Sequence, residues 1–313
     1  MNLYNYIFRR LLYVIPIVMG VSLLIFVIFN VVAGDPTAIL LGKHASLKQM
    51  AELRHELGLD RSWLMQYLDI LKSAFTFNFG RSWSTKQLIA PMIGTAAGVS
   101  FTLVIPAFIV TSILSISIAL IAAFYRGRLV DRSLVVVSVI MMSISGLTYI
   151  LLGQWLFAYK LGWFEIAGYE YGFPHFIPYI VLPGIILVIL SIGYEVRFYR
   201  TVILDEMYQD YVRTARAKGL PEWMVLFKHI LKNAMVSIIT NLIIQLPALL
   251  LGTLLVESFF GIPGLGGITM HAINNSDFPI IKAMTIISTV FYIIFNLITD
   301  VLYTLVDPRI RLS

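Results

Sequence analysis

The sequence predicts an all-α integral membrane protein with six transmembrane helices and a small external helical insertion between the first two. Composition supports this class, because 59% of the 313 residues are hydrophobic and 13% are charged, whereas soluble domains carry about 25% charged residues. The mean hydropathy of the chain is +0.86. Six segments also have the length of about 20 apolar residues that a helix needs to cross a bilayer.

The first expected span covers residues 11–32 and follows a short segment that ends in Arg9 and Arg10. A signal peptide would have a shorter apolar region and a cleavage site of small residues, so an uncleaved helix is favoured. The interior prolines of the later segments are of the kind that transmembrane helices tolerate. The five later spans are expected at residues 98–124, 133–158, 177–195, 235–257 and 281–304.

The distribution of basic residues predicts the orientation of the spans. The short segments on one side carry 14 Lys and Arg residues, whereas the short loops on the other side carry only Lys160 and Lys282. Basic loops stay in the cytoplasm, so both termini are expected there. The corresponding parts of the chain are a cytoplasmic tail with the first span (1–32), an external insertion (33–97), a five-span core (98–306) that includes a cytoplasmic loop (197–233), and a cytoplasmic C-terminal tail (307–313).

Two short amphipathic helices are expected in the external insertion. In residues 46–59 and again in residues 60–75, apolar side chains recur every three or four positions, which is the spacing of one helix face. Such helices would pack over the outer surface of the bundle. Two interpretations remain open: a lid that stabilises the fold, and a docking surface or gate through which a solute enters.

The cytoplasmic loop contains the stretch YVRTARAKGLPEWMVLFKHILKN, residues 211–233. A helix is expected over residues 205–218, with Tyr208, Tyr211, Val212 and Ala215 on one face. Gly219 is suited to follow it, because glycine adopts the left-handed conformation without a steric penalty. Pro221 suits the first turn of a second helix, where its missing N–H costs nothing. The apolar stripe expected on this second helix comprises Trp223, Leu226, Phe227, Ile230, Leu231 and Ala234.

The charge of this loop has a general explanation, because cytoplasmic loops are basic and a basic amphipathic helix lies on anionic lipid. That explanation does not account for the first helix, which places small residues beside cations and ends at a glycine. Small residues let the backbone of a partner approach closely, and the cations can meet acidic groups on that partner. The first helix therefore favours a docking site for a cytoplasmic protein.

The loop resembles the cytoplasmic signature loop of ABC importer permeases, often called the EAA loop. The similarity is greatest to the first, or B-type, permease subunit of the dipeptide, oligopeptide and nickel group, and it covers essentially the whole chain. The matching motifs, in order, are RRLLYVIPIVMGVSLLIFVI, AGDPTAILLG, LRHELGLDRSWLMQYL, FNFGRSW, KLGWFEIAGY, VESFFGIPGLGG and NLITDVLYTLVDPRIR. The resemblance implies the type I importer permease fold, in a bacterial cytoplasmic (inner) membrane.

In that family the loop forms a coupling helix that binds in a groove of the ATPase subunit. The resemblance places this helix at Arg213, Thr214, Ala215, Arg216, Ala217, Lys218 and Gly219. Gly219 matches the glycine of the family motif. Arg213 stands where many permeases have a glutamate, so the salt bridge of that glutamate is not expected here. Ser237 stands where this branch commonly has a proline, which predicts a less kinked start of the fifth span.

The resemblance implies a permease subunit that imports di- or oligopeptides by alternating access. Nickel, glutathione or another small solute is the alternative substrate, because the same branch carries them. The implied partners are a second homologous permease in a heterodimer, two ATPase subunits that bind ATP and Mg²⁺, and an external solute-binding protein. A secondary transporter is a more remote alternative, because neither inverted repeats nor an acidic residue at the midplane is evident.

The chain itself is expected to bind no cofactor, metal or nucleic acid and to catalyse no reaction. It has no phosphate-binding loop of the G-x-x-x-x-G-K-[ST] type, no cysteine, and five dispersed histidines without the spacing of metal ligands on a helix. The glycine-rich segment GIPGLGG, residues 261–267, follows a span on the external side. It predicts a tight turn or a re-entrant segment near the gate.

Four polar residues inside the spans are candidates for the translocation pathway. Asn241 and Gln245 lie one helical turn apart, and Ser143 and Ser145 lie in the third span. Uncharged polar groups can bind a peptide backbone without trapping it, although hydrogen bonding between helices explains them equally well. Glu195 is expected at the end of the fourth span, in an ion pair near the lipid headgroups.

Overall fold

The computed structural model describes residues 3–32, 37, 41, 46–250 and 253–306. The C-terminal tail and most of segment 33–45 therefore lie outside the described residues. The described part consists of helices joined by turns and loops, with one isolated β-bridge between Arg81 and Leu88. This architecture confirms the all-α fold class that the sequence predicts.

Five helical segments of the described chain are long and apolar enough to cross a membrane. They contain α1 (Leu3–Val27), continued by a π-helical stretch, η1 (Ile28–Val32); α5 (Ile89–Phe124); α8 (Ile177–Met207); α10 (Glu222–Met224) with the π-helical η3 (Val225–Leu231) and α11 (Lys232–Leu250); and α14 (Phe278–Val306). α5 begins before the expected second span, and α8 continues beyond the expected end of the fourth.

The third expected span, 133–158, is wrong as a single straight helix. It is divided into α6 (Leu129–Ser143) and α7 (Gly146–Gly153), which continues as the π-helical η2 (Gln154–Lys160), and the two parts meet at 90°. Ile144 and Ser145 between them are extended, with ψ angles of 134° and 139°. The flanking serine and glycine are poor helix formers. The bent pair counts as the sixth span when it is taken as one crossing.

Short helices occupy the cytoplasmic loop and the segment before α14. α8 ends at Met207 and α9 (Asp210–Ala217) follows as a separate helix, so the single helix expected over residues 205–218 is wrong at its start. α12 (Leu254–Phe259) and α13 (Leu265–Asn274) lie between α11 and α14. The fifth expected span, 235–257, therefore includes residues 251–252, outside the description, and part of α12.

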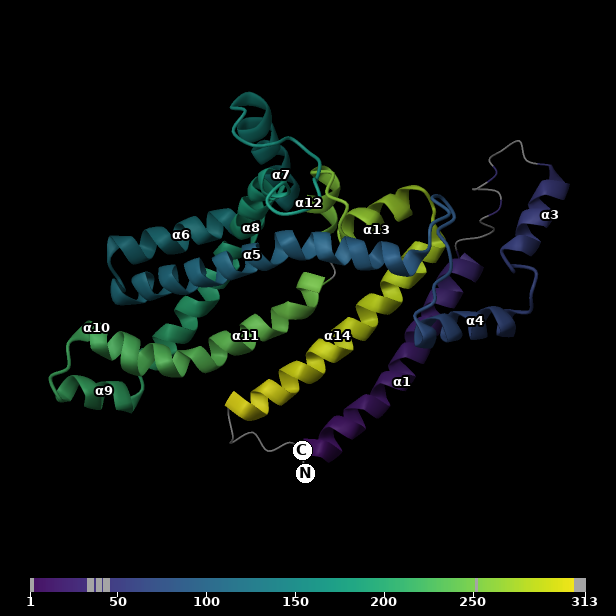
Figure 1. Cartoon of the computed structure of the whole chain (residues 1–313). Helices are drawn as coiled ribbons and strands as arrows, with labels where there is room; N and C mark the ends of the chain where they lie inside the picture. The colour runs from purple at the N-terminus through teal and green to yellow at the C-terminus, as the bar shows by residue number, and fades with distance from the viewer. Residues whose placement is uncertain (1–2, 33–36, 38–40, 42–45, 251–252, 307–313) are drawn as a thin grey trace.

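The most extensive helix pair is α5 with α8, and α6 and α11 pack on this pair. Gly193 of α8 lies so close to α6 that a Cβ atom there would be 2.9 Å from the Ser138 carbonyl oxygen, the close approach that small residues allow. α1 packs against α14 and α4. Figure 1 shows α9 and α10 at one end of the molecule and α3 (Leu47–Glu56) and α4 (Trp63–Thr76) at the other.

The insertion contains the two expected helices, α3 and α4. Ser46 begins α3 with a capping box, in which its hydroxyl accepts from the Gln49 N–H and its own N–H donates to the Gln49 side chain. α4 packs on α1, where the rings of Trp63 and Tyr67 meet Phe26 edge to face. α4 is thus part of the packed bundle, whereas α3 buries none of its residues.

A buried carboxylate joins the insertion to the core. Asp277, just before α14, accepts hydrogen bonds from the Trp83 N–H at 3.1 Å and from the Ser84 N–H and hydroxyl at 3.1 and 2.7 Å. The Ser82 hydroxyl donates a fourth. Burial alone would raise the pKa of Asp277, but these hydrogen bonds hold it below its usual value of 3.8.

Replacing Asp277 with alanine is expected to loosen segment 82–84 from the core, because the buried Ser82 hydroxyl loses its carboxylate acceptor, and a buried donor without an acceptor costs about 1–3 kcal/mol. Since folding lowers the pKa of Asp277, its stabilisation is present above pH 3.8 and is lost as the pH falls below that value. Lower protection of the Trp83 and Ser84 amides from hydrogen–deuterium exchange, relative to free amides at the same pH, measures both effects in the variant and in acid. Asp69→Ala removes only an exposed ion pair of the insertion and should leave this exchange unchanged. Equal protection in Asp277→Ala would contradict the assignment.

Candidate functional site

The turn between α9 and α10 has the glycine geometry that the sequence predicts. Gly219 has a φ angle of +78°, in the left-handed region, and its N–H donates to the Arg216 carbonyl at 2.9 Å. Pro221 has an extended ψ angle of 146° and precedes the first turn of α10 rather than lying in it. The conformation expected of Gly219 is therefore confirmed, and the second helix starts one residue later than expected.

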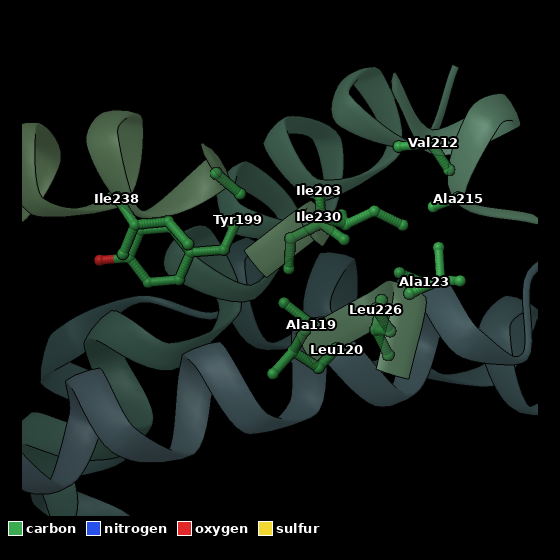
Figure 2. Close-up of a cluster of buried hydrophobic side chains, with 12 residues drawn as sticks. Ala119, Leu120, Ala123, Tyr199, Ile203, Val212, Ala215, Leu226, Ile230 and Ile238 are labelled. Carbon is green, nitrogen blue, oxygen red and sulfur yellow. The ribbon is translucent and has the colours of Figure 1, made fainter. Parts of the chain in front are cut away.

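One face of α9 is buried in the core of the bundle. Val212 is fully buried and Ala215 is 4% exposed. Both side chains point into a cluster that α9 shares with α5, α8, η3 and α11 (Figure 2). The other buried members are Ala119, Leu120, Ala123, Tyr199, Ile203, Val225, Leu226, Ile230, Ala234 and Ile238. This cluster, here called the α9 cluster, fixes α9 to three membrane-spanning segments.

A tyrosine adds a polar contact at the joint between α8 and α9. The Tyr211 hydroxyl donates a hydrogen bond to Glu206, near the end of α8. Burial and this hydrogen bond raise the pKa of Tyr211 to about 12, so the hydroxyl keeps its proton at neutral pH. The joint is thus held by both apolar packing and a hydrogen bond.

The opposite face of α9 is exposed and basic. Arg213, Thr214 and Ala217, with Lys218 just after the helix, are here called the exposed α9 face. The exposed Asp210 at the start of α9 lies 3.5 Å from the Arg213 guanidinium. Arg216 is directed toward α10, where it binds Glu222 through two hydrogen bonds of 2.8 and 3.2 Å. Ala215 lies in the α9 cluster, so its side chain is not available to a partner. The sequence grouped all seven residues of this helix end together, and the structure divides them between two faces.

The apolar stripe expected on the second helix is only partly correct. Leu226, Ile230 and Ala234 are buried, as the spacing predicts. Trp223 and Phe227 are 59% and 55% exposed, so the stripe is wrong at these two positions. The expected spacing assumed an α-helix, whereas η3 is π-helical and has a wider turn, which changes the positions that share a face.

A buried ion pair joins α6 to α8 at the same end of the molecule. Arg200 donates to both carboxylate oxygens of Asp131, at 2.6 and 2.9 Å, and the Gly127 N–H donates to the same carboxylate at 2.9 Å. The Arg126 guanidinium lies 4.7 Å from the centre of the Tyr208 ring. The basic turn between α5 and α6 therefore contacts the connection between α8 and α9.

The four candidate pathway residues fall into two regions. Ser143 and Ser145 are exposed at the junction of α6 and α7, and the Ser143 hydroxyl donates to a carbonyl of its own helix at 2.8 Å. The Asn241 amide donates to the Tyr199 hydroxyl at 3.3 Å and so connects α11 to α8. Gln245 lines a cavity of about 220 Å³ between α5, α8 and α11.

Glu195 does not lie at the end of a span, and the expected ion pair near the headgroups is wrong. It lies inside α8, is 1% exposed and lines the same cavity as Gln245. Among the ion pairs of the described residues, none involves Glu195. The charges of Glu195 and Arg197 predict a helix end, but α8 continues to Met207, with Arg197 exposed and Arg200 paired with Asp131.

A second buried carboxylate, Glu257 of α12, is surrounded by hydrogen-bond donors. It accepts from the Ser100 hydroxyl at 2.8 Å and from the Thr253 and Gly267 N–H groups at 3.1 Å each. The backbone at Gly264 passes so close that a Cβ atom there would lie 2.4 Å from oxygens of Glu257 and Ser100. The GIPGLGG segment thus forms the predicted tight turn, closed around a carboxylate. Nothing in the sequence indicated that this carboxylate would be its centre.

Metal binding requires several ligands in one place. Within the residues that the structure describes, no group of three or more His, Cys, Asp or Glu side chains is arranged to hold a metal ion. Glu195 and Glu257 line separate cavities.

Two family models match the chain and together cover nearly all of it. The model described as binding-protein-dependent transport system inner membrane component matches residues 115–312. The model for the N-terminal part of such membrane components matches residues 3–116. The junction between the two matches lies within α5.

Similar proteins include three transport permeases. A putative peptide transport system permease protein of Brucella abortus (strain 2308) is 32% identical over 315 residues, which is 97% of this chain and 98% of that protein. A probable peptide ABC transporter permease protein of Sinorhizobium fredii (strain NBRC 101917 / NGR234) is 32% identical over 311 residues, with 98% and 99% coverage. A glutathione transport system permease protein of Escherichia coli (strain K12) is 31% identical over 307 residues, also with 98% and 99% coverage.

Proposed function

The chain belongs to the family of binding-protein-dependent transport system inner membrane components, and we propose that its exposed α9 face is where an ATPase subunit docks and drives peptide import. Members of this family are ABC importer permeases, multi-pass membrane subunits that work with an ATPase and a solute-binding protein. What remains to be assigned is where the partners bind, which way the chain is oriented and what it carries.

The packing of α9 is the observation that carries the proposal. One face holds Val212 and Ala215 in the α9 cluster, and the other presents Arg213 and Lys218 beside the small Ala217. Packed interiors are not continuously deformable, so a displacement of α9 moves the segments that share its cluster. A protein that binds the exposed face can therefore transmit motion to α5, α8 and α11.

The positions of the basic residues support one orientation of the chain in the membrane. The contact between Arg126 and Tyr208 brings the basic turn after α5 and the connection before α9 to one end. Basic loops remain in the cytoplasm, which supports cytoplasmic α9 and cytoplasmic termini, with the insertion 33–97 outside. In this orientation α3 and α4 lie on the side from which a binding protein delivers the solute.

The energy for transport comes from partner subunits in this proposal. The chain contains no G-x-x-x-x-G-K-[ST] phosphate loop, so ATP and Mg²⁺ bind to two ATPase subunits. A second, homologous permease completes a heterodimer around the pathway. The solute is a di- or oligopeptide, which the names of the Brucella and Sinorhizobium relatives support. Glutathione, the solute named for the Escherichia coli relative, is the alternative.

Replacing Ala217 with tryptophan is expected to release the ATPase, because a large side chain in the exposed α9 face prevents close approach of a partner. Affinity purification of the tagged chain, co-expressed with its transport partners, measures the ATPase recovered per permease. Ala51→Trp is the matched control, since Ala51 is an exposed alanine of α3 at the other end of the molecule. Undiminished ATPase recovery with Ala217→Trp, at normal permease levels, would reject the docking site.

A further inference from the structure

A cavity of about 220 Å³ lies within the helix bundle between α5, α8 and α11. Both apolar and polar side chains line it. The apolar lining residues are Val104, Ala107, Phe108 and Leu187, and the polar ones are Thr111, Ser191, Glu195, Gln245 and Thr253. One water needs only about 10–15 Å³ of such volume, so the cavity has room for a small organic group.

Polar atoms without partners are concentrated at this cavity. Among the described residues, five buried side-chain polar atoms have no hydrogen-bond partner, and three of them are Glu195 Oε2, Gln245 Nε2 and Thr253 Oγ1. A fourth, Ser115 Oγ, belongs to a neighbour of the Glu195 carboxyl group. Each such atom costs about 1–3 kcal/mol when nothing binds it, so their concentration at one place indicates a ligand.

Among the ion pairs of the described residues, none supplies Glu195 with a positive charge. Ser115, Tyr199 and Gln245 lie close enough to offer hydrogen bonds to its carboxyl group, and all three are uncharged. On its own helix, Arg197 is exposed and Arg200 is held by Asp131. A buried charge without a counter-charge is costly, so the Glu195 carboxyl group keeps its proton while the cavity holds only water and ionises when a cation binds there.

We propose that this cavity binds a primary ammonium group that stands next to a carbonyl, the arrangement at the amino terminus of a peptide. The ammonium group donates to the Glu195 carboxylate and to the Thr253 hydroxyl. The neighbouring carbonyl accepts from Gln245 Nε2, and the carbon skeleton lies against Phe108 and the other apolar walls. A bare alkali ion would leave those walls without a partner. This inference rests on the proposed peptide transport and names the part of the peptide that is recognised.

The test uses the purified full-length chain in lipid nanodiscs and dicyclohexylcarbodiimide, an apolar reagent that adds to protonated carboxyl groups. Mass spectrometry measures the total modification of Glu195 with and without L-alaninamide, which carries both the ammonium and the carbonyl group. The total includes the carbodiimide adduct and any amide formed when the probe's amine attacks the activated carboxyl group, so such coupling counts as modification and not as protection. The labelling rate should fall as 1/(1 + [probe]/Kd), to about a tenth at ten times the Kd. N-acetyl-L-alaninamide, which lacks the ammonium group, and potassium chloride at equal ionic strength should give no protection.

Glu257 is the internal control, because neutral donors already bind its carboxyl group, and any labelling there should not respond to L-alaninamide. In Glu195→Gln, the label at position 195 should disappear. Protection by potassium or by the acetylated probe, labelling unaffected by L-alaninamide, or no labelling of Glu195 at all would each overturn the proposal. None of these results depends on the ATPase, so the ammonium site can fail while the docking of the ATPase to α9 stands, and the reverse.

Discussion

Substituting valine for Gly219 is expected to leave the protein in the membrane but to reduce ATP-driven uptake about tenfold. At a φ angle of +78°, a residue other than glycine costs roughly 1–2 kcal/mol, and each 1.4 kcal/mol shifts an equilibrium about tenfold. No heavy atom lies within 4 Å of the position of a new Cβ atom, so the substitution adds backbone strain and no clash. The turn relaxes, and the exposed α9 face moves relative to the α9 cluster.

The matched control is Gly162→Val, in the loop before α8. Gly162 also has a positive φ angle, +64°, and also has no atom within 4 Å of a new Cβ position, so it introduces comparable strain far from α9. Peptide uptake, ATP hydrolysis and the amount of protein in the membrane are measured for both variants. The Gly219 variant should keep its ATP hydrolysis while losing uptake. Normal uptake in that variant, or an equal loss in Gly162→Val, would contradict the coupling role of the turn.

Replacing Arg200 with methionine is expected to destabilise the permease by about 3–5 kcal/mol, the usual cost of removing one partner of a buried ion pair. Asp131 is 3% exposed, and both of its oxygens accept from Arg200. Without Arg200 the carboxylate retains only the Gly127 N–H. Loss of this ion pair weakens the contact between α6 and α8 near the connection from α8 to α9. Thermal unfolding in detergent measures the effect.

Adding Asp131→Asn to the Arg200→Met variant should restore much of the lost stability, because the uncompensated charge disappears. Arg213→Met is the control for an exposed pair, since the Arg213 and Asp210 side chains are 74% and 96% exposed, and exposed pairs contribute little. No recovery in the double variant, or an equal loss from Arg213→Met, would show that the charge of Asp131 is not the cause.

Hydropathy was sufficient to locate most of the spans, because a membrane requires long apolar segments and the sequence shows them directly. Hydropathy could not locate the bend at Ile144 and Ser145, because an average over about 20 residues does not change when the backbone of two of those residues becomes extended. It also stopped the fourth span at Glu195. α8 instead continues to Met207 and accommodates the charge of Arg200 by pairing it with Asp131 of α6, and a partner on another helix is invisible in a local pattern.

In the candidate site, too, local features could be predicted from the sequence and features that depend on packing could not. The conformation of Gly219 is a property of one residue type at a helix end, so the sequence predicted it correctly. Helical spacing also placed Val212 and Ala215 on one face, and that face is buried. The exposure of Trp223 depends on a π-helical turn and could not be derived from spacing. The position of Gln245 inside a span indicated a candidate pathway residue from sequence alone. The cavity beside Glu195 could not be predicted, because it forms only where α5, α8 and α11 pack together.

The lipid molecules around the protein cannot satisfy the polar backbone groups at the junction between α6 and α7. The 15 residues of α6 rise about 22 Å, less than the ~30 Å hydrocarbon core, so the junction lies at membrane depth. Two helix ends meet there, and their terminal carbonyl and N–H groups lack intrahelical partners. The Tyr149 hydroxyl supplies one by donating to the Met141 carbonyl at 3.1 Å. Ile144 is exposed, and acyl chains form no hydrogen bonds. The backbone around Ile144 therefore borders water or a neighbouring subunit. The acyl chains of the bilayer border other faces of this permease.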